Sequence, residues 1–326
     1  MSNPATSALT HRFIETNGIR MHIAEQGEGP LVVLCHGWPE SWYSWRHQLS
    51  ALAAAGYHVV APDQRGYGQT DKPEAIDQYT LLHLVGDIVG LLDALGEQRA
   101  VIAGHDWGAP VAWNAALLRP DRFRAVAGLS VPFSPRRPAA PRPTSVMPRS
   151  SEGVFYQLYF QEPGVAEAEF ERDVRSTLRR ILYGISGEPP EGERRFGLVP
   201  PTGFLTDRAD PAQLPPWLTE ADIDFYTAEF TRGGFRGGLN WYRNIDRNWE
   251  LMGAFAGATV QVPALFIGGE RDPVLSFPGA AERLAQLGTV LPGLRNTVVL
   301  PGCGHWTQQE RPTEVNAALI KFLQGV

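Results

Sequence analysis

Asp106 lies at the centre of a glycine-flanked pentapeptide, Gly104-His105-Asp106-Trp107-Gly108, between an apolar run and a helical one. This is the layout of a nucleophile elbow, with aspartate in the position that serine usually takes. The two glycines permit a tight turn that projects the central side chain, and the amino terminus of the following helix favours an anion there. Taken alone, the pentapeptide is also consistent with Asp106 serving only as a helix cap.

Two later segments favour the catalytic interpretation. Asp272 lies in the segment GGERDP and His305 lies in CGHW, each directly after an apolar run. An elbow of this kind has its acid and its histidine later in the chain than the nucleophile, and both occur here in that order. Since the carboxyl ends of parallel strands meet at one edge of a sheet, we expect the three side chains to come together there.

The chemistry of these three side chains predicts a two-step hydrolysis. An ionised Asp106 needs no base, so it can attack an electrophilic carbon directly and form an alkyl ester. His305, oriented by Asp272, then removes a proton from water, which attacks the carboxyl carbon of that ester. The prediction is therefore a hydrolase with a covalent intermediate on Asp106.

The elements that must position these residues are short apolar strands that alternate with helices. Strands that are apolar throughout are buried on both faces, which favours a parallel sheet covered by helices. The predicted strands are residues 31–35, 57–61, 100–103, 124–130, 263–268 and 297–300, and the predicted helices are residues 42–52, 108–118 and 312–323.

The alternation of strands and helices stops near Pro132 and resumes near Pro263. The stretch between them opens with a proline-rich segment and continues with aromatic and helical segments that show no strand pattern. We interpret residues 134–257 as an inserted, mostly helical cap domain. Residues 1–133 and 258–326 then form one core domain that the insertion interrupts.

Composition and charge limit the classes of partner and location. The chain has 326 residues, of which 43% are hydrophobic and 20% charged, and this is typical of a globular protein. A net charge of -6 without a basic run argues against nucleic acid as a partner. There is no run of ~18 apolar residues for a membrane-spanning helix and no signal-peptide layout, so we expect a cytoplasmic protein. The two cysteines, Cys35 and Cys303, have no metal-binding spacing and are expected to be free buried thiols.

Several longer segments together resemble the soluble epoxide hydrolases of the α/β-hydrolase superfamily, across nearly the whole chain. The segments that carry the resemblance are HGWPESWYSWRHQ, DQRGYGQTDKP, GHDWGAPVAW, FYQLYFQEPGVAEAEF, NWYRNIDRNWE and CGHWTQQERPTEVN. The chain is similar to the hydrolase domain of the animal enzyme without its amino-terminal phosphatase domain, as in bacterial members. The resemblance implies the α/β-hydrolase fold, with a mostly parallel central sheet flanked by helices and an inserted, mostly helical cap.

The resemblance also implies roles for two tyrosines. In the family, two cap tyrosines donate hydrogen bonds to the epoxide oxygen, and the matching residues here are Tyr156 and Tyr242. A phenol, with a pKa near ~10, is a better donor than water to the alkoxide that develops as the ring opens. Without the resemblance both are better explained as packed aromatic residues, and Tyr159, about one helical turn later, is the alternative to Tyr156.

The family's oxyanion hole maps onto the backbone N–H groups of Trp38 and Trp107, which would act when water attacks the ester. The resemblance further implies a cis peptide bond before Pro39, which would direct the Trp38 amide toward the site. Glu40 and His105 are candidates for placing the hydrolytic water, or are simply polar neighbours of the pocket. We leave these two outside the catalytic set.

An apolar epoxide is the substrate that the resemblance implies, with no cofactor and no metal. Phe155, Gln157 and Tyr159 are the predicted pocket residues, and aromatic residues such as Phe204 and Trp217 suggest an apolar cavity. The sequence does not identify the epoxide or the regio- and stereoselectivity. It also leaves the oligomeric state open, with a homodimer among the options.

The closest alternative is a dehalogenase, which uses the same fold, the same aspartate attack and often the same Asp-Trp pair. A halide needs weak N–H donors, whereas an epoxide oxygen needs an acidic O–H, and the paired tyrosine segments favour the epoxide. A non-catalytic binding protein on this fold is a second alternative, but such proteins usually lack a triad member and none is missing here. The aspartate at the elbow disfavours an ordinary serine esterase.

Overall fold

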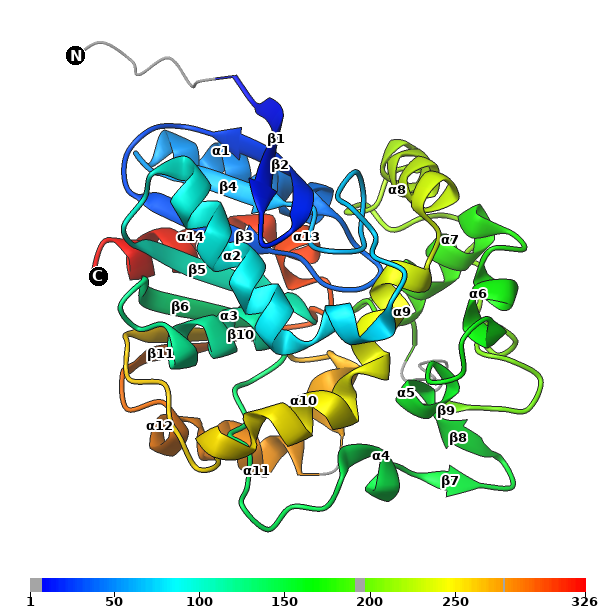
Figure 1. Cartoon of the computed structure of the whole chain (residues 1–326). Coiled ribbons are helices and arrows are strands. Elements are labelled where there is room, and N and C mark those ends of the chain that lie inside the picture. The colour runs from blue at the N-terminus through cyan, green and yellow to red at the C-terminus, as the bar shows by residue number, and fades with distance from the viewer. Residues whose placement is uncertain (1–7, 191–196, 278) are drawn as a thin grey trace.

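The fold is built around a central sheet. The structure is a computed structural model, and it describes residues 8–190, 197–277 and 279–326. Within these ranges eight strands form the sheet in the order β1-β2-β4-β3-β5-β6-β10-β11 (Figure 1). The pairs β1/β2 and β2/β4 are antiparallel, and every later pair is parallel, so the sheet is mostly parallel as expected. The strands are β1 (Thr10–Thr16), β2 (Ile19–Gln26), β3 (Leu31–Cys35), β4 (His58–Pro62), β5 (Ala100–His105), β6 (Phe123–Leu129), β10 (Ala264–Gly269) and β11 (Leu294–Leu300).

Burial explains why the apolar runs form the middle of the sheet. Every residue of β3, β5 and β10 is buried. A strand covered on both faces has no solvent-facing position, which is why continuous apolar runs predicted these strands. All six predicted strands are present, β3 with the predicted bounds and the others with shifted ends.

The sequence pattern does not predict the amino-terminal hairpin of β1 and β2. Most residues of β1 are exposed and polar, so the strand lacks an apolar run. The hairpin turn is Asn17-Gly18, and both residues have positive φ, 45° and 76°. Asn-Gly is a strong signal for such a two-residue turn, so the turn rather than the strands could have revealed this hairpin.

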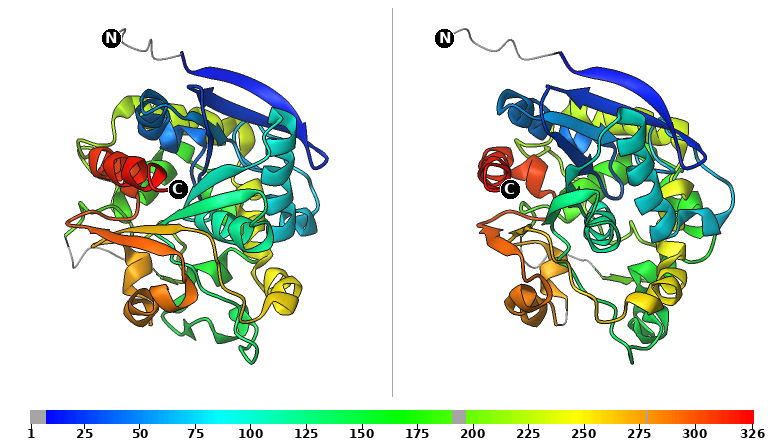
Figure 2. Two further views of the ribbon diagram at one scale, coloured as in Figure 1. Left: turned by 90° about the vertical axis from the view of Figure 1, so that its left-hand side faces the viewer. Right: turned by 60° about the vertical axis from the view of Figure 1, so that its left-hand side comes forward.

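Helices cover both faces of the sheet. The helices α2 (Leu81–Leu95) and α3 (Gly108–Leu118) lie on one side of the sheet, and α1 (Arg46–Ala54) and α14 (Pro312–Leu323) lie on the other (Figure 2). Side chains of the first pair belong to one buried cluster, and those of the second pair belong to another. No helix in the described ranges is long and apolar enough to cross a membrane. The remaining elements outside the insertion are η1 (Trp42–Trp45), η2 (Ile76–Tyr79), η5 (Pro273–Ser276), α11 (Ala280–Ala285), α12 (Leu287–Val290) and α13 (Thr307–Glu310).

The segment between β6 and β10 lies beside the sheet, on the side away from the carboxyl terminus of the chain (Figure 1). It contacts loops that follow strands of the central sheet: the Trp241 indole donates to the Arg65 carbonyl at 3.0 Å, and the Trp306 indole donates to the Leu182 carbonyl at 2.7 Å. Its helices are α4 (Pro143–Val146), α5 (Tyr156–Tyr159), α6 (Val165–Phe170), α7 (Val174–Gly184), α8 (Glu220–Gly233), α9 (Arg236–Arg243), α10 (Ile245–Leu251) and η4 (Met252–Phe255).

This segment also contains strands, contrary to the expectation from the sequence. Within the described ranges β7 (Arg149–Ser150), β8 (Gly153–Phe155) and β9 (Leu198–Val199) form a separate three-stranded sheet. Strands of two or three residues are too short to show a repeating pattern, so periodicity could not reveal them.

Candidate active site

Asp106 lies at a sharp turn between β5 and α3, as the pentapeptide predicts. Its φ is 49°, a left-handed conformation that residues other than glycine rarely adopt. A Cβ on Gly104 would lie 1.9 Å from the Gly108 carbonyl oxygen, and a Cβ on Gly108 would lie 2.0 Å from the Cys35 carbonyl oxygen. Since only glycine fits at either position, the two flanking glycines make the turn possible.

The loop after β3 brings its backbone to the Asp106 carboxylate. The Trp38 N–H donates to Asp106 Oδ1 at 2.8 Å, and the Trp38-Pro39 bond is cis, as the resemblance implies. A Cβ on Gly37 would lie 2.4 Å from the Asp106 Cβ, so the approach requires glycine. Burial acts to raise the pKa of Asp106, but His305 and the Trp38 N–H hold this pKa below its usual value. The carboxylate is therefore an anion at neutral pH.

His305 lies between two carboxylates. Its Nε2 is 3.4 Å from Asp106 Oδ2, and its Nδ1 is 3.1 Å from Asp272 Oδ1. Burial acts to lower the pKa of His305, but the charges of these carboxylates and its hydrogen bonds to them raise it well above its usual value. The imidazole is therefore held as a cation while Asp106 is charged.

A serine that the sequence did not single out also reaches this imidazole. Ser130 follows β6, has a φ of 69° and places its Oγ 3.0 Å from His305 Nδ1. It shares that nitrogen with Asp272 Oδ1, which also accepts from the Val274 N–H at 2.9 Å. The only sequence signal for Ser130 is its position at the end of a buried strand, on the edge where Asp106 and Asp272 also lie.

The two tyrosines matched by the resemblance share a narrow cavity with Asp106 and His305. Their ring centroids are 5.9 Å apart, and both side chains are buried. Burial, followed by the charge of Asp106, raises the pKa of both phenols, so both stay protonated and able to donate. The cavity has a volume of about 20 Å³ and is lined by Trp38, Asp106, Tyr156, Ile181, Ile185, Phe204, Arg208, Tyr242, Val274 and His305.

Trp107, the second predicted oxyanion donor, directly precedes α3. Its backbone N–H lies at the amino terminus of that helix, where N–H groups have no partner within the helix. Its indole packs against Tyr242, with ring centroids 5.1 Å apart. The Trp38 ring also packs against Tyr242, with ring centroids 5.9 Å apart. Both tryptophans therefore pack against the Tyr242 ring and also flank the Asp106 carboxylate.

The three predicted pocket residues lie outside the lining of this cavity. Phe155 packs against Phe277, with ring centroids 5.4 Å apart, and Gln157 Nε2 donates to the Tyr156 hydroxyl oxygen at 3.0 Å. The Tyr159 hydroxyl donates to Glu169 Oε2 at 2.6 Å, away from Asp106. Tyr159 is three residues after Tyr156 in α5, so helical spacing alone would place it on the same face, but its hydrogen bond to Glu169 holds its hydroxyl away from Asp106.

Glu40 and His105 are buried beneath the site and bonded to its loops. Glu40 accepts hydrogen bonds from the Gly37 N–H at 2.8 Å and from the amides of Gln308 and Gln309, each at 3.0 Å. The two nitrogens of His105 are 2.8 Å from Glu40 Oε2 and 2.7 Å from the His305 carbonyl oxygen. The pair therefore ties the loop that carries Trp38 to the loop that carries His305.

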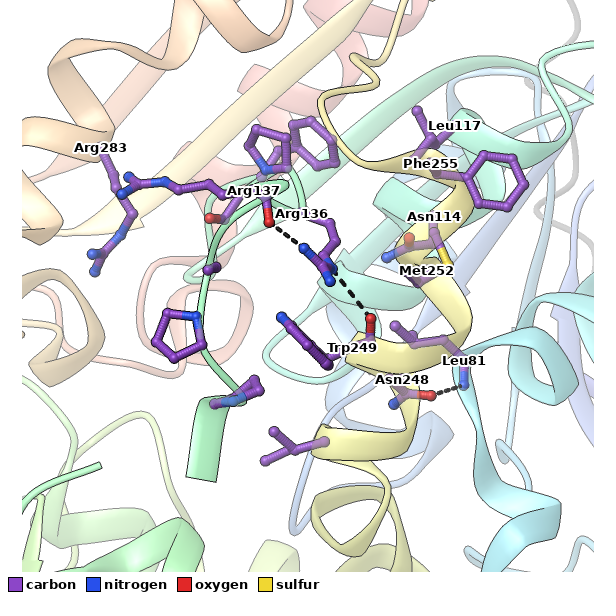
Figure 3. A pocket seen from close by; sticks show the side chains of 17 residues that line it. Leu81, Asn114, Leu117, Arg136, Arg137, Asn248, Trp249, Met252, Phe255 and Arg283 are labelled. Atoms are coloured by element: carbon purple, nitrogen blue, oxygen red, sulfur yellow. Dashed lines mark hydrogen bonds between the residues drawn. The ribbon is translucent and has the colours of Figure 1, made fainter. Parts of the chain in front are cut away.

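A second, larger cavity contains none of these groups. Its volume is about 460 Å³, and it lies between α3, α10 and the proline-rich segment after β6 (Figure 3). Arg136 stacks on the Trp249 ring at 4.1 Å and donates to the Trp249 carbonyl at 3.2 Å. The chemistry of the triad and the phenols is thus confined to the narrow cavity.

Comparison with known proteins agrees with this geometry. A family described as "alpha/beta hydrolase fold" matches residues 30–312. The chain is 51% identical to "Epoxide hydrolase A" of Mycobacterium tuberculosis over 98% of each chain, and 45% identical to "Epoxide hydrolase 3" of Siraitia grosvenorii over 97% of this chain and 98% of the relative.

Two solved structures of epoxide hydrolases are also similar to this chain. An epoxide hydrolase from an endophytic Streptomyces has a TM-score of 0.93 and 51% identity, and covers 97% of this chain and 96% of its own. Epoxide hydrolase A from Mycobacterium thermoresistibile has a TM-score of 0.90 and 53% identity, over 98% and 99% of the two chains. The chain belongs to the epoxide hydrolases of the α/β-hydrolase superfamily.

Proposed function

We propose that this chain converts an epoxide and water into a vicinal diol through an alkyl ester on Asp106. One observation carries the proposal: the carboxylate of Asp106, the imidazole of His305 and the phenols of Tyr156 and Tyr242 line one cavity. Opening an epoxide needs a nucleophile at carbon and a proton donor at oxygen, and this cavity supplies both.

In the first step, a carboxylate oxygen of Asp106 attacks a ring carbon, and the bond between that carbon and the ring oxygen breaks. The bonding electrons move to the ring oxygen, which takes a proton from Tyr156 or Tyr242. An alkoxide is more basic than a phenolate, so this transfer is favourable even though burial raises the pKa of both phenols. The products are an Asp106 ester and a phenolate.

Ester formation removes the charge that holds His305 as a cation. The Asp106 carboxylate is 3.4 Å from His305 Nε2, and it is one of the two carboxylates that raise the pKa of this histidine. Once Asp106 is esterified, the cation is less stable and can return a proton to the phenolate. The first step thereby produces the neutral imidazole that the second step requires.

In the second step, neutral His305 takes a proton from water as the hydroxide attacks the ester carbonyl carbon. The N–H groups of Trp38 and Trp107 stabilise the oxyanion, and the Trp38 N–H is already bonded to Asp106 Oδ1 at 2.8 Å. The tetrahedral intermediate expels the alkoxide, which takes the remaining hydroxyl proton. The diol leaves, and Asp106 and His305 regain their starting charges.

The same geometry argues against halide release as the main activity. A halide leaves without a proton and is bound by weak N–H donors, whereas the cavity presents two O–H donors near Asp106. The indoles of Trp38 and Trp107 are near enough to keep the dehalogenase alternative testable. We expect diol formation from styrene oxide and no halide release from a 1-haloalkane.

One turnover in heavy-oxygen water tests the covalent route. Because water attacks the ester carbonyl carbon, the label should enter the Asp106 carboxylate, and mass spectrometry of the peptide that contains it measures this. The Asp106→Asn variant is the control and should form no diol. Label found only in the diol would mean that water attacks the epoxide directly, and the covalent route would be wrong.

We extend the proposal to the organisation of the chain. Residues 134–257 form a cap that supplies the phenols, and residues 1–133 and 258–326 form the core that supplies the triad. In support of this division, Tyr156 lies on α5 and Tyr242 lies on α9, both within residues 134–257. The apolar epoxide substrate is part of this proposal. A cytoplasmic location and a homodimer stay predictions, which cell fractionation and size-exclusion chromatography would test.

A further inference from the structure

The larger cavity, between α3, α10 and the proline-rich segment after β6, has the size and the lining of a small-molecule site (Figure 3). Its volume is about 460 Å³. Small-molecule pockets are typically about 300–1,000 Å³ and have a mostly apolar lining with a few polar groups. The apolar part of this lining includes Leu117, Phe133, Trp249, Met252 and Phe255. Phe255 is 39% exposed, so the protein itself does not fully cover its ring.

The charged groups that line this cavity are all positive. Arg136, Arg137 and Arg283 line it, and no aspartate or glutamate is among its lining residues in the described part of the chain. Arg136 donates to the backbone carbonyls of Trp249 at 3.2 Å and Pro138 at 3.1 Å, and its guanidinium carbon lies 4.1 Å from the centroid of the Trp249 ring. Carbonyl oxygens are neutral acceptors, so these bonds hold the guanidinium in place without changing its charge.

The two acidic side chains of α10 are bonded to groups outside the cavity. Glu250 accepts from Arg142 and, at 3.2 Å, from Arg247, and Asp246 accepts from the Thr144 N–H at 3.1 Å. None of these five residues lines the cavity. The carboxylates of α10 therefore do not add a negative charge to its lining.

Apolar and charged groups lie at different edges of the cavity. Arg283 is at one edge, and Leu117 and Phe255 are at the opposite one (Figure 3). A ligand that matches this arrangement has an apolar chain and an anionic group at one end. Such a ligand buries apolar area and forms charge-assisted hydrogen bonds at the same time.

We infer that this cavity is a second binding site, which takes an amphipathic anion: an apolar chain that ends in a carboxylate or phosphate group. The chain packs against Met252 and Phe255, and the arginines hold the anionic group, for which a guanidinium is a good match in shape and charge. No residue that lines this cavity also lines the cavity of Asp106. The inference therefore does not depend on the proposed reaction.

Isothermal titration calorimetry with decanoate and decan-1-ol tests this inference, because the two ligands have the same chain length and differ in the head group. Decanoate should bind the wild-type protein more tightly than decan-1-ol does. Replacing Arg136 and Arg137 together with methionine removes two charges and keeps apolar side chains. This change should weaken decanoate binding about 10- to 100-fold and leave decan-1-ol binding nearly unchanged. Decyl phosphate, titrated into the same proteins, identifies which anionic head group is preferred.

Two further variants serve as controls, and circular dichroism checks that each variant is folded. Arg142 lies in the same proline-rich segment and donates to Glu250 without lining the cavity, so Arg142→Met should bind decanoate as the wild-type protein does. Ala140→Trp places a large ring in the cavity and keeps its arginines, so it should weaken the binding of all three ligands.

The remaining outcomes are also decisive. Equal losses of decanoate and decan-1-ol binding in the double variant, or a loss of decanoate binding in Arg142→Met, would attribute the effect to the position of the segment and overturn the inference. If the double variant does not fold, Arg137→Glu decides, because Arg137 is exposed: it must weaken decanoate binding and leave decan-1-ol binding unchanged.

Binding of neither anion to the wild-type protein would overturn the inference. Decanoate binding that Ala140→Trp does not change would also overturn it, since the ligand would then lie outside this cavity. A failure to form diol from styrene oxide would overturn the proposed function and leave this inference intact.

Discussion

Replacing Tyr242 with phenylalanine separates the two proposed chemical steps. The substitution removes one O–H donor from the cavity and keeps the ring, which packs against Trp38 and Trp107 with centroids 5.9 and 5.1 Å away. The phenol donates only while the epoxide oxygen gains charge, and it has no part in the attack of water on the ester. Tyr242→Phe should therefore slow ester formation and leave ester hydrolysis unchanged.

The size of this effect follows from the charge on the acceptor. A hydrogen bond to a charged group contributes about 1.5–3 kcal/mol, and each 1.4 kcal/mol corresponds to about a tenfold change in rate, so ester formation should slow by about 10- to 150-fold. Tyr156→Phe should have a similar effect on the rate. It should also lower the free energy of unfolding, because Gln157 Nε2 loses the acceptor that now lies 3.0 Å away.

Single-turnover tryptophan fluorescence measures the two steps separately, because Trp38 and Trp107 contact both the carboxylate region and the phenol. A fast phase reports ester formation and a slower phase reports its hydrolysis. Tyr242→Phe should change only the fast phase, and the variant with both tyrosines replaced should not form the ester. A slower second phase with an unchanged first phase would refute the assignment of the phenols to ring opening.

Three further predictions follow from the same contacts. His305→Gln should form the ester and fail to hydrolyse it, so intact-protein mass spectrometry should show a mass increase equal to one epoxide, whereas an unmodified mass would contradict its role as base. Asp106→Asn should lower the pKa of His305, because one of the two carboxylate charges that raise this pKa is lost. An NMR titration of the imidazole measures the pKa, and an unchanged pKa would contradict the proposed charge coupling. Gly104→Ala should lower the free energy of unfolding by about 1–3 kcal/mol or more, since the added Cβ would lie 1.9 Å from the Gly108 carbonyl oxygen. Denaturation measurements test this, with Gly253→Ala as the control that should be tolerated, because a Cβ added there would have no atom within 4 Å.

The parallel part of the fold could be predicted because its strands, apart from the edge strand β11, are largely buried on both faces. Such strands leave a continuous apolar run in the sequence, as in β3 and β10. The exposed edge strand β1 and the short strands β7 to β9 leave no such run, because exposure or brevity removes the pattern. Their pairing depends on turns and tertiary contacts that apolar periodicity does not record.

The candidate triad could be predicted from chain order because Asp106, Asp272 and His305 each follow a strand of the sheet, β5 and β10 being fully buried and β11 ending in a short apolar run. Ser130 also follows one, but a serine after a strand has no distinctive spacing. Arg208 lies between β9 and α8 in the chain, and its place in the cavity depends on how the segment between β6 and β10 folds. Side chains that reach a site by tertiary packing are therefore the ones that motif reasoning misses.

The distribution of groups between the sheet and the inserted segment suggests which part of the chemistry each determines. Asp106, Asp272 and His305 come from loops at the ends of three strands, and Glu40 and His105 tie the loop that carries Trp38 to the loop that carries His305. The phenols and Arg208 all come from the segment between β6 and β10. In the proposed mechanism the sheet thus fixes the nucleophile and the base, whereas the insertion supplies the proton donors for the leaving oxygen. Changing the insertion alone would alter the leaving group or the substrate while the sheet keeps the same nucleophile and base, which is why the dehalogenase and epoxide hydrolase interpretations share one triad and differ at the phenols.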